Sequence, residues 1–162
     1  MIASSGILLH RTGPNGRVEV LLGHMGGPFW ARKDAAAWSI PKGEHGGDED
    51  ARDAARREFT EELGSAPPPG PLEALGTVRS GRKTVAAFAL AGDLDADAIV
   101  SNTFEMEWPP RSGRRVSFPE IDRAAWFDLA TAREKIVRSQ VPFLDRLASP
   151  PVTGRPGDAS DG

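Results

Sequence analysis

One segment of the sequence limits the fold more than any other, residues 43–65, which read GEHGGDEDARDAARREFTEELGS. Near its end lie three glutamates, Glu58, Glu61 and Glu62, at spacings of i, i+3 and i+4. In an α-helix this spacing puts all three on one face, within an arc of about 100°. Carboxylates so close repel each other, which a helix serving stability alone would avoid. A bound Mg²⁺ or Mn²⁺ reverses that penalty, so the spacing predicts a metal site on a helix.

The residues on either side of the glutamates predict where this helix begins and ends. Asp48 is the expected N-cap, and Gly64, with Pro67–Pro69 just beyond it, is the expected C-terminal stop. Arg57 precedes Glu61 by four residues, so its guanidinium is expected to hold that carboxylate in one orientation.

The segment before the helix is rich in glycine. Pro41-Lys42-Gly43 and Gly46-Gly47 predict a loop whose backbone can approach an ion or a phosphate closely. Taken together, Gly43, five residues, Glu49, seven residues and then REFTEELG over 57–64 resemble the Nudix box of the Nudix hydrolases. Ser65 departs from the bulky aliphatic residue that ends the box. The resemblance covers most of residues 3–147.

The resemblance implies a fold and a chemistry. The fold is an α/β domain, an α/β/α sandwich around a mixed β-sheet. The family hydrolyses a nucleoside diphosphate linked to another group, by attack of water at phosphorus. Carried over by position, the resemblance implies metal ligation of Mg²⁺ or Mn²⁺ by Glu58, Glu61, Glu62 and the Gly43 carbonyl. It also implies that Arg57 orients the cluster and that Glu49 supports the junction of loop and helix.

The general base is left open by the sequence. Some members of the family take it from the box and others from a later loop, so Glu58, Glu105 and Glu107 are the candidates. Residues 103–108 alternate, with Phe104, Met106 and Trp108 on one side and the two acids on the other. Trp108 is therefore expected in the core, while Glu105 and Glu107 could supply a base or a further ligand, or be ordinary exposed strand residues.

Candidate substrate contacts lie in three places. Lys42 precedes the box glycine in WSIPKGE, an approach similar to that of dinucleoside polyphosphate hydrolases. Trp30 follows Phe29 in a loop that also holds Arg32 and Lys33, so it could stack on a base or fold onto the core. A turn over residues 109–115 carries Arg111, Arg114 and Arg115, which suit a polyphosphate or a merely solvated turn.

The expected substrate is accordingly a nucleotide or dinucleoside polyphosphate. The second hypothesis is a nucleoside triphosphate pyrophosphohydrolase, because members that act on these compounds share the same metal helix. The third is a non-catalytic nucleotide sensor on the same fold. The intact Glu58, Glu61 and Glu62 cluster argues against the sensor, since pure binding does not need several metal ligands.

Length and composition limit the number of domains and the classes of site and partner that the chain can have. The 162 residues predict one domain over residues 1–148 and a disordered tail over 149–162, which is rich in proline and glycine. There is no cysteine, which excludes disulfides and thiolate chemistry. A net charge of −3 argues against general nucleic-acid binding. No apolar run reaches the length of a membrane span, so the expectation is a cytoplasmic protein that does not bind membranes.

The rest of the chain predicts strands around the central helix and further helices near the C-terminus. Two hairpins are expected, because turn-forming residues separate each pair of strand-like runs. The predicted strands cover residues 4–10, 17–25, 38–40, 75–80, 84–90, 103–108 and 124–129, and the predicted helical segments cover residues 130–137 and 142–148.

Overall fold

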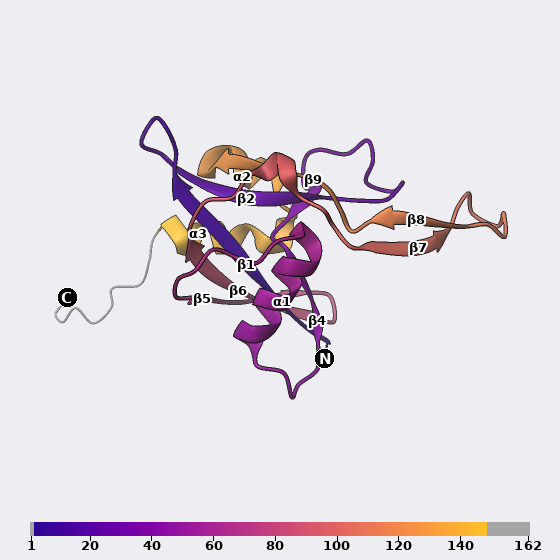
Figure 1. The fold of residues 1–162 in the computed structure, drawn as a ribbon, viewed down its shortest axis with the longest axis horizontal. Helices are drawn as coiled ribbons and strands as arrows, with labels where there is room; N and C mark the ends of the chain where they lie inside the picture. Colours follow the sequence, from indigo (N-terminus) through magenta and orange to yellow (C-terminus); the bar gives the residue numbers. More distant parts are fainter. Residues whose placement is uncertain (1, 149–162) are drawn as a thin grey trace.

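The chain folds around one mixed β-sheet, and the computed structural model describes residues 2–148 (Figure 1). In chain order the elements are β1 (Ile2–Thr12), β2 (Val18–Met25), β3 (Trp38–Ser39), β4 (Lys42–His45), α1 (Ala51–Leu63), β5 (Glu73–Ser80), β6 (Lys83–Ala91), η1 (Ala96–Ala98), β7 (Thr103–Glu107), β8 (Arg115–Pro119), β9 (Ile121–Asp128), α2 (Leu129–Lys135), η2 (Arg138–Gln140) and α3 (Val141–Ala148). The predicted disorder of residues 149–162 lies outside the described residues.

The sheet is mixed because β1 pairs in parallel with β6 and antiparallel with β2 and β4. The strand order is β3-β2-β1-β6-β5, with β9 on the far side of β2. Both predicted hairpins are confirmed, since β1 pairs with β2 and β5 pairs with β6, each antiparallel.

Strands β1 and β2 separate as they run away from the turn that joins them, which leaves an opening in the sheet. They pair with each other only over the last residues of β1, His10–Thr12. The segment 38–45 fills the opening between them, pairing first with β2 as β3 and then with β1 as β4. The expected loop at Pro41-Lys42-Gly43 is therefore wrong in part, because Lys42 and Gly43 belong to strand β4.

Alternate residues of the central strands enter two different cores, as a strand's two-residue period requires. Ile7 and Leu9 of β1 pack beneath α1 against Phe59, while Leu8 packs on the opposite face. That second core contains Phe143 of α3 and residues of α2. A sheet with helices on both faces is the predicted α/β/α sandwich.

Helix α1 begins two residues later than the sequence indicates. Its N-cap is Asp50, whose carboxylate accepts a hydrogen bond from the Asp53 backbone N–H at 3.1 Å. The expected cap at Asp48 is wrong because the chain is still in a turn there. The C-terminal stop at Gly64 is confirmed, with φ at 81°, a conformation that glycine adopts readily.

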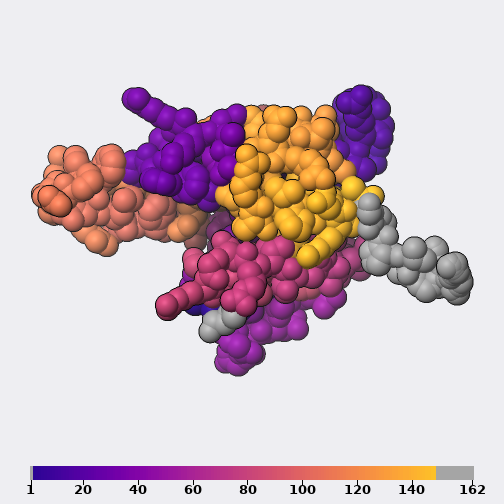
Figure 2. Space-filling model, turned by 180° about the vertical axis from the view of Figure 1, so that it is seen from behind, coloured from indigo at the N-terminus to yellow at the C-terminus, as the bar shows by residue number. Residues whose placement is uncertain are grey.

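The strands β7 and β8 pair only with each other and form an arm that projects from the body of the molecule (Figures 1 and 2). The prediction that Trp108 is in the core is wrong, because it lies at the end of this arm and is 38% exposed. The alternation of residues 103–108 is real, but the two-stranded arm has no second layer to bury its apolar side. The strand β8 begins at Arg115, within the segment expected to be only a turn.

Candidate active site

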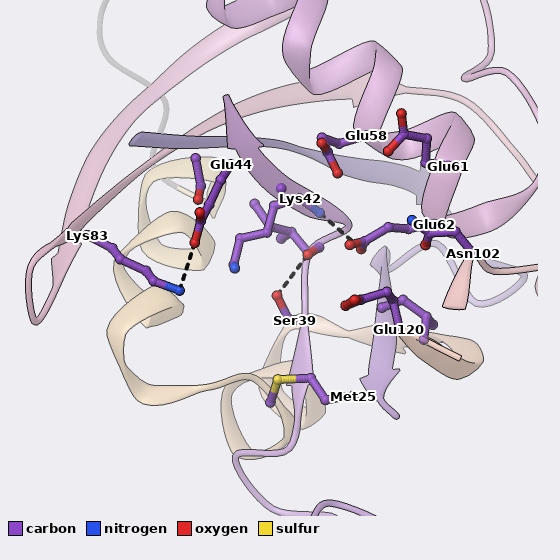
Figure 3. A pocket seen from close by; sticks show the side chains of 14 residues that line it. Met25, Ser39, Lys42, Glu44, Glu58, Glu61, Glu62, Lys83, Asn102 and Glu120 are labelled. Atoms are coloured by element: carbon purple, nitrogen blue, oxygen red, sulfur yellow. Dashed lines mark hydrogen bonds and ion pairs between the residues drawn. The ribbon is translucent and has the colours of Figure 1, made fainter. Parts of the chain in front are cut away.

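The three glutamates of α1 lie beside a cavity of about 420 Å³. Glu58 and Glu62 are buried, 7% and 9% exposed, while the Glu61 side chain is 43% exposed. Figure 3 shows them on one side of the cavity, with Lys83 and Glu44 on the other and Lys42 between. The walls consist of Ser4, Met25, Ser39, Ile40, Lys42, Gly43, Glu44, Glu58, Glu61, Glu62, Lys83, Asn102, Glu120 and Ile121.

Arg57 supplies the counter-charge for this cluster. Its Nη1 donates to Glu58 at 2.7 Å and to Glu61 at 3.2 Å. Its Nε and Nη2 bind the two carboxylate oxygens of Glu49, each at 3.0 Å. This bidentate contact joins the turn before α1 to the middle of the helix. The Arg57 guanidinium holds the pKa of Glu49 below its usual range, and the same contacts raise the pKa of Arg57 itself.

Burial changes the acid–base behaviour of the cluster. It raises the pKa of Glu62 to about 8, against the opposing effect of the Lys42 backbone N–H, which donates to Glu62 at 3.3 Å. Burial also raises the pKa of Glu58. Both shifts arise because a carboxylate removed from water loses hydration. A charge-compensating cation is what would return these carboxylates to the ionised form.

Strand β4 brings the backbone of Gly43 against the cluster. A Cβ at position 43 would collide with the Glu58 carboxylate, so only glycine allows this approach. Carboxylate and carbonyl oxygens are the ligands that Mg²⁺ and Mn²⁺ prefer. The donor set at Glu58, Glu61, Glu62 and Gly43 therefore fits a hard divalent cation. Within residues 2–148, no three acidic or imidazole side chains are already arranged as a ligand set for one ion.

Glu120 also lines the cavity, although no motif in the sequence predicts it as a site residue. It lies between β8 and β9, and its backbone N–H donates to the Asn102 carbonyl at 2.9 Å. Its own carbonyl accepts from the Gly26 N–H at 3.0 Å. In Figure 3 its side chain lies on the same side of the cavity as Glu62. The only signal in the sequence was an acid just before a strand, which is too common to single out.

Five further predicted site residues lie on the arm, and none of the five lines the cavity. Glu107 accepts a hydrogen bond from the Gly113 N–H at 2.6 Å, and Glu105 pairs with Arg115 at 3.8 Å. Arg111 and Arg114 are exposed in the turn that joins β7 to β8. The structure thus gathers the box residues and Lys42 at one site and leaves these five residues elsewhere. Their roles in catalysis and substrate binding stay predictions.

The aromatic loop before β3 is likewise outside the cavity. Trp30 is half-buried and packs against the core on the α3 side of the sheet, which is one of the two orientations expected for it. Phe29 is 65% exposed, and the Lys33 ammonium lies 3.6 Å from its ring centroid. His24 is fully buried and hydrogen-bonded to Asp122 and to the Lys33 carbonyl, contacts that fit a structural role.

Comparison with known families supports what the box residues indicate. The family model described as NUDIX domain matches residues 3–147. The chain belongs to the Nudix family. Comparison with curated proteins gave no match. None of the described helices is long and apolar enough to cross a membrane.

Solved structures share this Nudix fold at low sequence identity. A Caenorhabditis elegans Ap4A hydrolase in a binary complex has a TM-score of 0.64 and 18% identity, covering 92% of this chain and 96% of its own. The NUDIX domain of Shewanella oneidensis NrtR, complexed with ADP ribose, has a TM-score of 0.62 and 16% identity, covering 91% and 86%. A MutT protein from Methanosarcina mazei Go1 has a TM-score of 0.55 and 22% identity, covering 91% and 92%.

Proposed function

We propose that this Nudix protein is a pyrophosphohydrolase that depends on a divalent cation. It would cleave a phosphoanhydride bond in a nucleoside diphosphate linked to another group. The observation that carries the proposal is the pair of buried glutamates, Glu58 and Glu62, in the wall of a cavity that also holds Lys42. Buried like charges are costly, and a site that holds cations and binds phosphates gives the arrangement a use.

Mg²⁺ or Mn²⁺ would be held by Glu58, Glu61 and Glu62 with the Gly43 carbonyl. A bound cation of this kind neutralises phosphate charge and lowers the pKa of water. The chain's own residues do the rest. Arg57 positions the Glu58 and Glu61 carboxylates through its hydrogen bonds to both. Glu49 anchors that arginine from the turn before α1.

A carboxylate within reach of the attacking water would accept its proton. Glu58 and Glu120 both line the cavity, so they are the candidates that the geometry favours. Glu107, predicted from the sequence, stays a candidate only if the arm approaches the cavity when substrate binds. Lys42 lies between the two ends of the cavity, where its ammonium can bind phosphate oxygens during the reaction.

The substrate class rests on the resemblance and on the neighbours. The Caenorhabditis elegans relative is named as an Ap4A hydrolase, and the Shewanella oneidensis domain was solved with ADP ribose. Both compounds are nucleoside diphosphates linked to another group. We therefore propose a dinucleoside polyphosphate as substrate, with a nucleoside triphosphate as the second candidate.

The experiment that tests this function is a substrate panel with matched variants. Phosphate and pyrophosphate release from nucleotides, dinucleoside polyphosphates and sugar nucleotides would be measured with Mg²⁺. Glu62→Gln keeps the side-chain volume but removes the charge, so we expect kcat to fall by about two orders of magnitude or more with the fold intact. Glu134→Gln, on the exposed surface of α2, is the control. Near-normal turnover by Glu62→Gln at low Mg²⁺ would refute the metal assignment.

A further inference from the structure

The end of the cavity opposite the carboxylates is built by one face of three neighbouring strands. In the register of the sheet, Ser4 of β1 stands opposite Glu44 of β4, two residues along from Lys42. On the other side of β1, Ile2 stands opposite Lys83 of β6. Residues that are paired, or two apart on a strand, share a face of the sheet. Ser4, Lys42, Glu44 and Lys83 therefore face the same way, and all four line the cavity.

Two of these side chains lack the partners that buried polar groups normally have. The Ser4 hydroxyl is buried, 2% exposed, and is the one buried side-chain polar atom in residues 2–148 without a hydrogen-bond partner. The Lys42 side chain is half-buried, and within the same part of the chain its ammonium makes no hydrogen bond or ion pair. Most buried polar groups in proteins are hydrogen-bonded, so each exception calls for an explanation.

The third member of this end is Lys83, and its present partner is itself a carboxylate. The Lys83 ammonium binds Glu44 at 3.1 Å, and both side chains are about half exposed, 47% and 56%. A pair this exposed is weak and easily exchanged for another anion. Glu44 thus occupies a place where an anionic oxygen from solution could bind to the same ammonium.

We propose that Ser4, Lys42 and Lys83 form a subsite for a phosphate group of the substrate that lies beyond the phosphates at the α1 carboxylates. The proposal rests on the proposed function and deepens it. A phosphate there satisfies the Ser4 hydroxyl and the Lys42 ammonium, and it displaces Glu44 from Lys83. The two ammonium groups are donors only, and the Ser4 hydroxyl can add one more donor, so the set suits a phosphate, which offers only acceptors, better than a sugar. The subsite therefore selects chains of three or more phosphates over diphosphates.

Binding of inorganic tripolyphosphate to the metal-free protein tests the subsite without requiring catalysis. We expect tripolyphosphate to raise the melting temperature of the wild type, and Lys83→Gln or Ser4→Ala to weaken its binding about tenfold or more. Glu44→Gln should tighten binding, because it removes the competing carboxylate. Arg82→Gln is the matched control, since Arg82 is the exposed neighbour of Lys83 and does not line the cavity. Equal binding by wild type and Lys83→Gln, or no binding at all, would overturn the subsite.

Ser4→Ala separates a binding role from a structural one. The hydroxyl has no protein partner, so its removal should leave the melting temperature unchanged or raise it. A variant that melts at a lower temperature and binds tripolyphosphate normally would show that Ser4 serves the fold.

Steady-state kinetics then distinguish failure of the subsite from failure of the proposed function. With Mg²⁺, Lys83→Gln should raise KM for diadenosine tetraphosphate about tenfold and leave KM for ADP-ribose within about twofold. If both substrates are hydrolysed and the two KM values change equally, the subsite is refuted and the hydrolase stands. If wild type binds tripolyphosphate but hydrolyses neither compound, the subsite stands and the proposed function fails for these substrates.

Discussion

Arg57 shows how one side chain can keep a cluster of like charges together. It contacts the carboxylates of Glu49, Glu58 and Glu61, which come from a turn and from two positions on one helix. Each contact is a charge-assisted hydrogen bond, and the contact to Glu49 is bidentate, which fixes the guanidinium plane. Lysine could not replace it, because an ammonium has no fork with which to bind Glu49 in this way.

A single residue away from the cavity gives a prediction about pH. Burial lowers the pKa of His10 on β1, against a smaller opposite effect of Glu73. In the unfolded chain, where the histidine pKa is about 6.5, His10 binds protons more readily than in the fold. Its contribution to stability is therefore present above pH 6.5 and is lost as the pH falls through the folded value.

His10→Gln should accordingly make the protein less sensitive to acid. Urea unfolding at about pH 8 and about pH 5 measures this, and the wild type should lose more unfolding free energy between the two values than the variant. His24→Gln is not a suitable control, because His24 is fully buried in a network of its own. Parallel pH profiles for wild type and His10→Gln would mean that His10 does not contribute.

At the scale of elements, α1 supplies the end of the cavity that holds the carboxylate cluster. It carries the three glutamates on the face toward the cavity, and its residues Ala55 and Phe59 pack beneath the sheet. A glycine-rich turn separates α1 from β4, which pairs with β1. Across this turn, Gly43 of β4 lies close to the Glu58 carboxylate of α1. The position of the first helical turn therefore affects the spacing between Gly43 and the cluster.

The cap at Asp50 can be tested against the cap that the sequence indicates. Asp50→Ala removes the hydrogen bond to the Asp53 N–H and should cost about 1 kcal/mol, seen as a drop in melting temperature of a few degrees. Asp48→Ala should stay within about 0.5 kcal/mol of wild type, because Asp48 precedes the cap. A larger loss in Asp48→Ala than in Asp50→Ala would contradict this assignment.

The sequence predicted the elements that depend on residues close together in the chain. The face of α1 and the two hairpins follow from periods and turn residues within a few positions of each other. Glu120 and Lys83 join the site only because β9 pairs with β2 and β6 pairs in parallel with β1. Those pairings join residues about 80 to 110 positions apart, and no pattern within either segment indicates its partner. The prediction for Trp108 was wrong for the same reason, since β7, the strand just before it, pairs with β8 alone.

At the scale of the whole molecule, one sheet borders both the hydrophobic cores and the cavity, but with different parts of its strands. The C-terminal half of β1 has both faces in hydrophobic cores, whereas its N-terminal half borders the cavity through Ser4. Burial of the cores stabilises the fold independently of the cavity. The cavity can therefore keep groups that are unfavourable for stability, such as buried Glu62.

This separation predicts how the protein responds to metal. Because a cation that binds only the folded state stabilises it, Mg²⁺ at about a hundred times its Kd should raise the melting temperature by roughly 5–10 °C. Glu61→Gln should reduce the shift, while its own melting temperature without metal stays equal or rises through relief of repulsion. Glu134→Gln should show the full shift. An equal shift in Glu61→Gln would exclude Glu61 as a ligand.

The arm is attached to the body where the cavity begins. The chain enters the arm after Asn102 and leaves it at Glu120. These two residues are joined by a backbone hydrogen bond of 2.9 Å, and both line the cavity. The Ser101 hydroxyl accepts from the Ile121 N–H at 3.0 Å and secures the same junction. Any rigid-body rotation of the arm must therefore pivot at residues that also line the cavity. A partner that bound the tip of the arm and rotated it would displace Glu120.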